Sequence, residues 1–152
     1  MLLLPAGVRA DLERWVRAGY PHETCGLLVG RERLGVMRVQ RALEARNLAM
    51  DLGQSFELDP GTHLVADREA RSQGLAIVGV WHSHPDRPPV PSEADRAAAW
   101  KKWSYLILSI GVLPSGSVGL GGVRSWRLVR GVFEEEEARV VSRLTSGVRA
   151  PE

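Results

Sequence analysis

Residues 75–81 read LAIVGVW, an apolar run with no polar interruption. A strand with one face in water alternates apolar and polar residues, whereas a continuous apolar run needs protein packed on both faces. We therefore expect a central strand in a sheet that is covered on each side. His82, Ser83 and His84 follow this run directly, so any site built on the two histidines would lie at the end of a buried strand.

Two helices are predicted before this strand. Apolar residues recur at helical spacing over residues 6–19. The second helix is expected to begin at Asp59 and Pro60, because aspartate can accept hydrogen bonds from free amides of the first turn and proline there loses no donor. Gly74 is expected to end it. Its core-facing side is predicted to hold Leu64, Val65 and Ala70.

Short apolar or alternating runs predict the remaining strands, at residues 25–30, 34–40, 42–47, 104–113 and 123–130. A third helix is expected from Ser92 through residues 97–103, and the glycine-rich residues 114–122 read as a hairpin loop. Residues 133–144 fit either a helix or a strand. This order of elements predicts an α/β chain (mixed α+β), with a mixed β-sheet flanked by helices.

Composition limits the kinds of partner that we expect. The chain has 152 residues and a net charge of +2 without a basic run, which favours neither a nucleic-acid nor a membrane partner. We expect one domain over residues 1–144 and a flexible tail over residues 145–152. Cys25 is the single cysteine, which excludes an internal disulfide and suits the cytoplasm. Because Cys25 lies in an apolar run, we expect an inert buried thiol.

His82 and His84 are candidate metal ligands. Side chains two residues apart on a strand point to the same side, so both imidazoles could bind one ion, with nitrogens about 2.0–2.1 Å from a zinc. The alternative is that the histidines only end the strand and find hydrogen-bond partners. For two histidines at this position, spacing alone leaves the two interpretations about equally good.

The residues after the histidines supply a third candidate ligand. The segment PDRPPVP, residues 85–91, cannot form a helix or a central strand and is expected to be a stiff loop. Ser92 and Asp95 then form a capping-box pattern, which is a sufficient structural explanation for both. Asp95 could still bind a metal, and two histidines plus one aspartate would leave a fourth position for water, as in catalytic zinc sites.

A water activated in this way needs a base to take its proton. Glu23 precedes the buried run at residues 25–30 and is a candidate. By its position alone it is more often a solvated turn residue.

Glu23, His82, Ser83, His84, Ser92 and Asp95 together match the pattern E…H-[ST]-H-x7-S-x2-D at every position. This pattern resembles the signature of the JAMM (MPN-plus, JAB-domain) zinc metalloproteases. The segment PHETCGLLVG resembles the P-x-E-x-C-G-L-L-x-G segment of the small prokaryotic members, and FELDP and HSHP belong to the same pattern. The similarity extends over residues 1–135.

The resemblance implies a JAB/MPN fold, related to that of cytidine deaminases, and a zinc-dependent peptidase or isopeptidase activity. His82, His84 and Asp95 would be the zinc ligands. Glu23 would be the general acid/base, and Ser92 would donate a hydrogen bond to the oxyanion. A zinc deaminase itself is excluded, because that chemistry needs H-x-E with P-C-x-x-C and the chain has one cysteine.

Some small prokaryotic members of this family trim residues from the C-terminal diglycine of ubiquitin-like sulfur-carrier proteins. The resemblance therefore implies such a carrier as partner and hydrolysis of the amide bond after its diglycine. The alternatives are a non-catalytic MPN-type binding scaffold and a peptidase of the same family with a different peptide substrate. A homodimer is a further expectation, for which no residue gives evidence.

Overall fold

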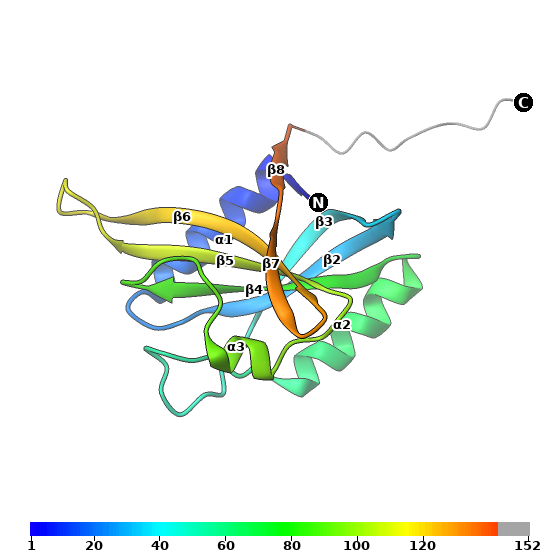
Figure 1. Cartoon of the computed structure of the whole chain (residues 1–152), viewed down its shortest axis with the longest axis horizontal. Helices are drawn as coiled ribbons and strands as arrows, with labels where there is room; N and C mark the ends of the chain where they lie inside the picture. The colour runs from blue at the N-terminus through cyan, green and yellow to red at the C-terminus, as the bar shows by residue number, and fades with distance from the viewer. Residues whose placement is uncertain (143–152) are drawn as a thin grey trace, which may run out of the picture.

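The apolar run at residues 75–81 lies in the interior of an eight-stranded sheet, as expected. The structure is a computed structural model that describes residues 1–142, so the expected tail at residues 145–152 lies outside the described residues. The elements are, in chain order, β1 (Leu2–Pro5), α1 (Ala6–Gly19), β2 (Cys25–Arg33), β3 (Val36–Ala45), α2 (Pro60–Ser72), β4 (Ala76–Pro85), α3 (Glu93–Ala97), β5 (Ser104–Val112), β6 (Val118–Val129), β7 (Val132–Glu136) and β8 (Ala138–Val141) (Figure 1).

The strands follow the order β7-β6-β5-β4-β2-β3-β1-β8 across the sheet. β4 is parallel to β5 and antiparallel to β2. β1 runs parallel to both of its neighbours, and the other pairs are antiparallel. The predicted mixed sheet is therefore confirmed, and β4 lies between two long strands that fix its position.

The two long helices cover different faces of this sheet (Figure 1). α1 buries Val8, Leu12 and Val16 in one apolar cluster with residues of β2, β4 and β5. α2 contributes Ala66 to a second cluster, which includes other residues of β4 and β5, among them Ile77, Val80, Tyr105 and Ile107. β4 is thus apolar on both sides because each side has its own core.

The buried face of α2 differs in part from the expected one. Ala70 is buried as predicted, but Leu64 and Val65 are 54% and 57% exposed, and Ala66 takes their place. Ala66 and Ala70 lie one turn apart on the sheet side of the helix. Leu64 and Val65 are rotated from this row by about 200° and 100°, given roughly 3.6 residues per turn, and therefore face outward.

The capping predictions for α2 are confirmed. The Asp59 side chain accepts a hydrogen bond from the Gly61 amide at 3.0 Å, and Pro60 is the first helical residue. The helix ends at Ser72, and Gly74 has a φ of 67°, a left-handed conformation that glycine adopts without steric cost.

Two expectations about length are corrected. The third helix contains only Glu93–Ala97, because the chain turns away after Ala98 and the Trp100 amide donates to the Tyr105 hydroxyl instead of a helical carbonyl. The glycine-rich segment forms a turn only near Gly116, and residues 118–122 are already part of β6.

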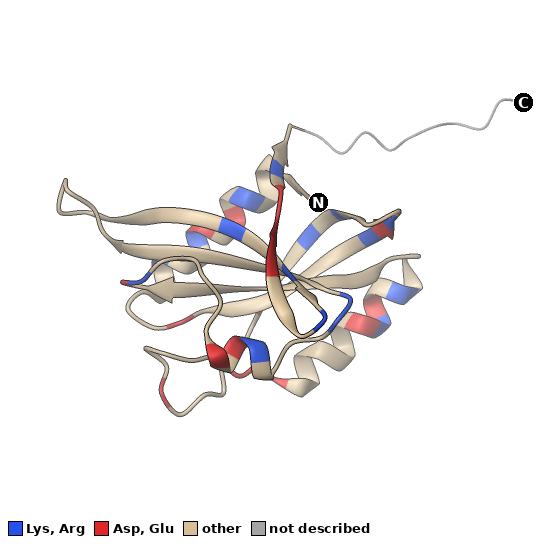
Figure 2. Ribbon diagram, in the orientation of Figure 1, with Lys and Arg blue, Asp and Glu red and all other residues tan. Residues whose placement is uncertain are grey.

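The segment for which the sequence left a helix and a strand open forms two strands within residues 132–141. β7 and β8 are separated by one residue but lie at opposite ends of the sheet order. The acidic run at residues 134–137 forms the end of β7 and leads into β8, and Figure 2 shows it as a continuous red segment. Within it, the Glu136 carboxylate accepts hydrogen bonds from Ser104 Oγ, Ser125 Oγ and Arg127 Nε at 2.5, 2.8 and 2.9 Å.

None of the helices within residues 1–142 combines the length and apolar composition needed to cross a bilayer.

Candidate active site

His82 and His84 lie in the second half of β4, and both side chains are buried. Their Nε2 atoms face each other at 3.1 Å, as the strand alternation predicts. Ser83 has a different role: its Oγ accepts a hydrogen bond from the Thr24 amide at 2.8 Å. The strand therefore presents two imidazoles together and uses the intervening serine to hold the segment that follows Glu23.

The start of α3 brings a carboxylate to the two histidines. Asp95 Oδ1 lies 3.3 Å from His82 Nε2, and Asp95 Oδ2 lies 3.4 Å from His84 Nε2. The predicted capping box is also present, since Asp95 Oδ2 accepts from the Ser92 amide at 2.7 Å and Ser92 Oγ accepts from the Asp95 amide at 3.1 Å. Helix capping and contact with the histidines are thus compatible.

The proline-rich loop is held by its carbonyl oxygens. Pro88 O lies 2.9 Å from His84 Nδ1, Pro89 O accepts from Trp126 Nε1 at 3.0 Å, and Arg87 O accepts from Ser109 Oγ at 2.6 Å. These contacts fasten the loop to β4, β5 and β6. It therefore delivers Ser92 and Asp95 to a fixed place.

Glu23 lies just before β2, and only 2% of its surface is exposed. Its amide donates to Leu52 O at 2.5 Å, and its carbonyl accepts from Asn47 Nδ2 at 3.0 Å. Its carboxylate offers an oxygen that lies within 4.8 Å of a ring nitrogen of each of His82 and His84. The partner of that carboxylate is Arg87, whose Nη2 lies 3.0 Å from Glu23 Oε2.

The surroundings change the acidity of three of these groups. Burial raises the pKa of Glu23 to about 7, although the positive charge of Arg87 opposes this. Burial lowers the pKa of His82, against the effect of Asp95. Burial would raise the pKa of Asp95, but contacts with His82 and His84 and the Ser92 amide hold it well below its usual range. Such perturbed carboxyl and imidazole groups are common in active sites.

The donor set could hold a metal ion. The described residues contain a cluster of Glu23, His82 and His84 with converging ligand atoms, and Asp95 contacts both histidines more closely than 3.5 Å. His82 Nδ1 is buried without a hydrogen-bond partner among the described residues, and the Phe56 ring stacks on the His82 imidazole with centroids 4.3 Å apart. Both imidazoles are buried, so a metal ion between them would be shielded from bulk water.

Cys25 cannot be a strong nucleophile here. It is fully buried at the start of β2, opposite His82 in the sheet register. Burial raises the pKa of its thiol to about 12, so the thiolate needed for nucleophilic attack is scarce at neutral pH. This agrees with the inert thiol that the sequence predicts.

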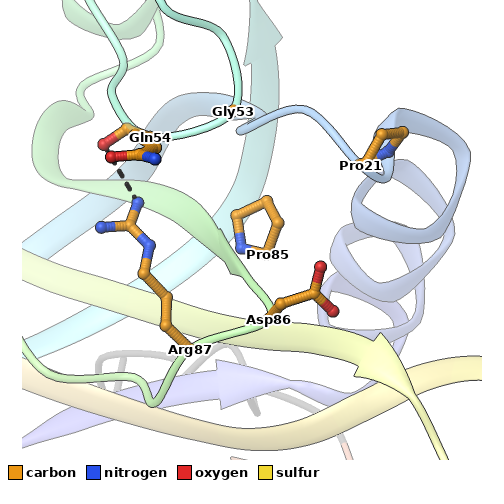
Figure 3. A pocket seen from close by; sticks show the side chains of 6 residues that line it. All are labelled: Pro21, Gly53, Gln54, Pro85, Asp86 and Arg87. Carbon is orange, nitrogen blue, oxygen red and sulfur yellow. Dashed lines mark hydrogen bonds between the residues drawn. The ribbon is translucent and has the colours of Figure 1, made fainter.

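A pocket of about 420 Å³ adjoins the site on the side of Arg87. Arg87 Nη2 donates to Gln54 O at 3.2 Å across it, and the Tyr20 hydroxyl donates to Asp86 at 2.8 Å. Figure 3 shows the side chains around this space, which come from the end of α1, the β3–α2 loop and the end of β4. The lining residues are Pro21, Gly53, Gln54, Pro85, Asp86 and Arg87.

Two residues of the site were not anticipated from the sequence. Arg87 carried a usable signal, because it is a charged residue within a stiff loop that follows two candidate ligands. Asn47 carried no such signal. Its side-chain Nδ2 donates to Glu23 O and to Ser55 O, each at 3.0 Å, and these contacts depend on how the β3–α2 loop folds.

Comparison with known proteins adds a family to this geometry. The family model described as prokaryotic homologs of the JAB domain matches residues 5–129. The chain is 38% identical to a desampylase of Haloferax volcanii over 71% of this chain and 80% of that protein. It is 28% identical to a probable TtuB-protein conjugate cleaving protease of Thermus thermophilus, over 93% of this chain and 83% of that protein.

A solved structure is similar over nearly the whole chain. The solution structure of protein DSY2949 from Desulfitobacterium hafniense is 29% identical, with a TM-score of 0.81, and the match covers 95% of this chain and 96% of that one. Together with the family match over residues 5–129, this shows that the chain belongs to the prokaryotic JAB-domain family.

Proposed function

We propose that this chain is a zinc-dependent peptidase or isopeptidase that hydrolyses the amide bond after the C-terminal diglycine of a ubiquitin-like or sulfur-carrier protein. The observation that carries the proposal is the arrangement of Glu23, His82, His84 and Asp95 around one buried point. Two relatives support the substrate class, since their names describe a desampylase and a TtuB-conjugate cleaving protease. The lone Cys25 suits a cytoplasmic setting, in which thiols stay reduced.

His82, His84 and Asp95 are the proposed zinc ligands. Ligand atoms of a tetrahedral zinc site with bonds of about 2.0–2.1 Å lie roughly 3.3 Å apart. The two Nε2 atoms here are 3.1 Å apart, and each lies at a similar distance from one Asp95 oxygen, His82 Nε2 at 3.3 Å from Oδ1 and His84 Nε2 at 3.4 Å from Oδ2. A zinc ion held there would act as a Lewis acid toward water and the scissile carbonyl.

Glu23 is the proposed general acid/base. Its carboxylate is buried beside the histidines, and its pKa of about 7 suits a group that accepts a proton and returns it at neutral pH. In this role it takes a proton from the attacking water and gives it to the nitrogen of the leaving amine. Arg87 and the Asn47 amide hold the residue in place during both transfers.

Ser92 is the proposed donor to the oxyanion. Its Oγ already accepts the Asp95 amide at 3.1 Å, so its own hydroxyl proton remains free to donate elsewhere. A preorganised donor of this kind typically contributes about 2.7–4 kcal/mol to transition-state stabilisation. The capping box therefore also fixes the position of this hydroxyl.

The pocket beside Arg87 is the proposed path of the carrier's tail. Two terminal glycines have no side chains, so a protein can recognise them only through their amide groups and through space too narrow for larger residues. The pocket offers polar groups of Arg87, Gln54 and Asp86 for such contacts (Figure 3).

The test is intact-mass analysis of several C-terminally extended sulfur carriers after incubation with zinc-loaded protein. We expect cleavage after the diglycine by wild type and by Glu69→Gln, a control on the exposed side of α2, and none by Glu23→Gln. Cleavage by all three proteins at equal rates would refute the role of Glu23. Tight carrier binding without cleavage would instead favour the scaffold, and cleavage of other peptides alone would favour a different substrate.

A further inference from the structure

We propose that Arg87 is a positioning and specificity-determining residue that connects the tail pocket to Glu23. This inference rests on the proposed function for its substrate. The proposal has two parts. First, the guanidinium holds the Glu23 carboxylate in place. Second, the remaining N–H groups of the guanidinium bind a main-chain carbonyl of the diglycine tail.

The guanidinium lies between the two places that it would connect. Its Nη2 is 3.0 Å from Glu23 Oε2 on one side and donates to Gln54 O at 3.2 Å on the other. Figure 3 shows the second contact as a dashed line across the pocket. One side chain therefore touches both the proposed base and the pocket wall.

The contact with Glu23 is an ion pair without the alignment of a hydrogen bond. Glu23 Oε2 has no hydrogen-bond partner among the described residues, although Arg87 Nη2 is only 3.0 Å away. The guanidinium thus holds the carboxylate through a single nitrogen, which leaves most of the carboxylate lone pairs available. That is what a base needs, whereas an aligned, bidentate ion pair would occupy those lone pairs.

Arg87 also has donor capacity that the described residues do not use. Its Nε is buried and has no hydrogen-bond partner among residues 1–142. A buried donor without a partner costs free energy, and a carbonyl oxygen in the pocket would relieve this cost if the guanidinium turned to bring Nε to the pocket surface. A diglycine tail offers such carbonyls without side chains that would compete for the space.

The backbone of Arg87 is fixed on both sides, so the side chain starts from a defined position. The Asp86 amide donates to Ile110 O at 2.8 Å, and Arg87 O accepts from Ser109 Oγ at 2.6 Å. Pro88 follows and restricts the backbone of Arg87. Holding the guanidinium in one place therefore costs less entropy than it would on a flexible loop.

The experiment compares Arg87→Met, Arg87→Lys and the control Arg71→Met in steady-state cleavage of a carrier with an extended tail. Arg71 is 76% exposed on α2, and its one salt bridge within residues 1–142 is to Asp67. For Arg87→Met we expect kcat to fall about 10- to 100-fold and KM to rise about 3- to 10-fold. Arg87→Lys keeps the charge but not the fork of donors, so kcat should recover in part while KM stays raised. Arg71→Met should match wild type.

A second measurement is independent of catalysis. Binding of a hexapeptide that ends in Gly-Gly to metal-free protein is followed by NMR titration, with thermal unfolding recorded for each variant. Weaker binding by Arg87→Met, at an unfolding midpoint near that of Arg71→Met, would support the proposal. If Arg87→Met does not fold, Arg87→Lys decides the same question.

The outcomes separate this proposal from the proposed function. If wild type cleaves carriers and both Arg87 variants have wild-type kcat and KM, the role of Arg87 is wrong and the function stands. If wild type cleaves no carrier, the proposed function fails. The peptide titration then still tests whether Arg87 binds a diglycine tail. Equal binding by wild type and Arg87→Met, or no binding by wild type, would then overturn the proposal.

Discussion

The carbonyl oxygen of Pro88 lies 2.9 Å from Nδ1 of His84. Because a carbonyl can only accept, the ring nitrogen must donate, so a neutral His84 carries its proton on Nδ1 and keeps a lone pair on Nε2. That lone pair points toward Asp95 and His82. The proline loop thus sets the tautomer of a proposed ligand as well as the position of α3, in the way that outer partners commonly orient metal-binding histidines.

We expect the chain to bind one zinc ion through His82, His84 and Asp95. Asp95→Asn should keep an oxygen to accept from the Ser92 amide, and so keep α3, while losing the charge that a zinc site requires. Isothermal titration should therefore show one site in wild type and at least about tenfold weaker binding in the variant. His22→Ala, at an exposed position, is the control, and equal affinity in wild type and Asp95→Asn would contradict the ligand assignment.

Zinc should also raise the stability of the folded protein. A ligand at about 1,000 times its dissociation constant adds roughly 4 kcal/mol to the free energy of unfolding, provided that it does not bind the unfolded chain. We expect the thermal midpoint of wild type to rise with zinc and to fall with a chelator. His82→Ala should respond to neither, and a response equal to that of wild type would show that zinc binds elsewhere.

The metal-free protein should lose stability with rising pH because of Glu23. The pKa of this carboxyl is raised from 4.5 to about 7 by burial, so its contribution is fully present below pH 4.5 and is lost as the pH rises through about 7. Glu23→Gln removes this loss. Between pH 5 and pH 8, the free energy of unfolding of the variant should therefore rise by on the order of 2–3 kcal/mol relative to that of wild type.

Urea unfolding of chelator-treated protein at the two pH values measures this gain. Glu69→Gln is the control, because the exposed Glu69 side chain pays no comparable burial penalty. A stability difference between wild type and Glu23→Gln that does not change with pH would mean that Glu23 ionises normally in the fold.

Cys25 should resist modification in the native protein. With a pKa of about 12, its thiolate would be about one part in ten thousand at pH 8, and the side chain is fully buried. Iodoacetamide should therefore label the native protein far more slowly than the urea-unfolded protein. Cys25→Ala should retain cleavage activity, and loss of activity in a folded variant would show that the thiol takes part in the reaction.

The sequence predicted most accurately where local chemistry decides the structure. Asp59–Pro60 and Ser92–Asp95 cap helices as expected, because a cap depends on residues within one turn. β4 was predictable because burial on both faces leaves a continuous apolar run. The five residues of the proposed site could be named from the spacing of the signature, although their roles remain proposals.

The errors have a common physical origin in contacts between distant segments. Leu64 and Val65 looked like core residues, but the rotation of α2 is set by the sheet beneath it, and small alanines allow the closest approach. The third helix was expected to continue beyond Ala97, but the Tyr105 hydroxyl captures the Trp100 amide. Arg87 meets Glu23 across 64 residues of sequence, so its place in the stiff loop could mark the residue but could not reveal this partner.

The alternation of His82, Ser83 and His84 along β4 also bears on how this strand finds its native register against β2 during folding. Cys25 is opposite His82 in the sheet, and Ser83 bonds the Thr24 backbone. Sliding β4 by one residue would turn both imidazoles away and put the serine hydroxyl in their place. A shift by one residue would therefore lose the proposed zinc site, and an ion captured late in folding would favour the observed register over that shifted one.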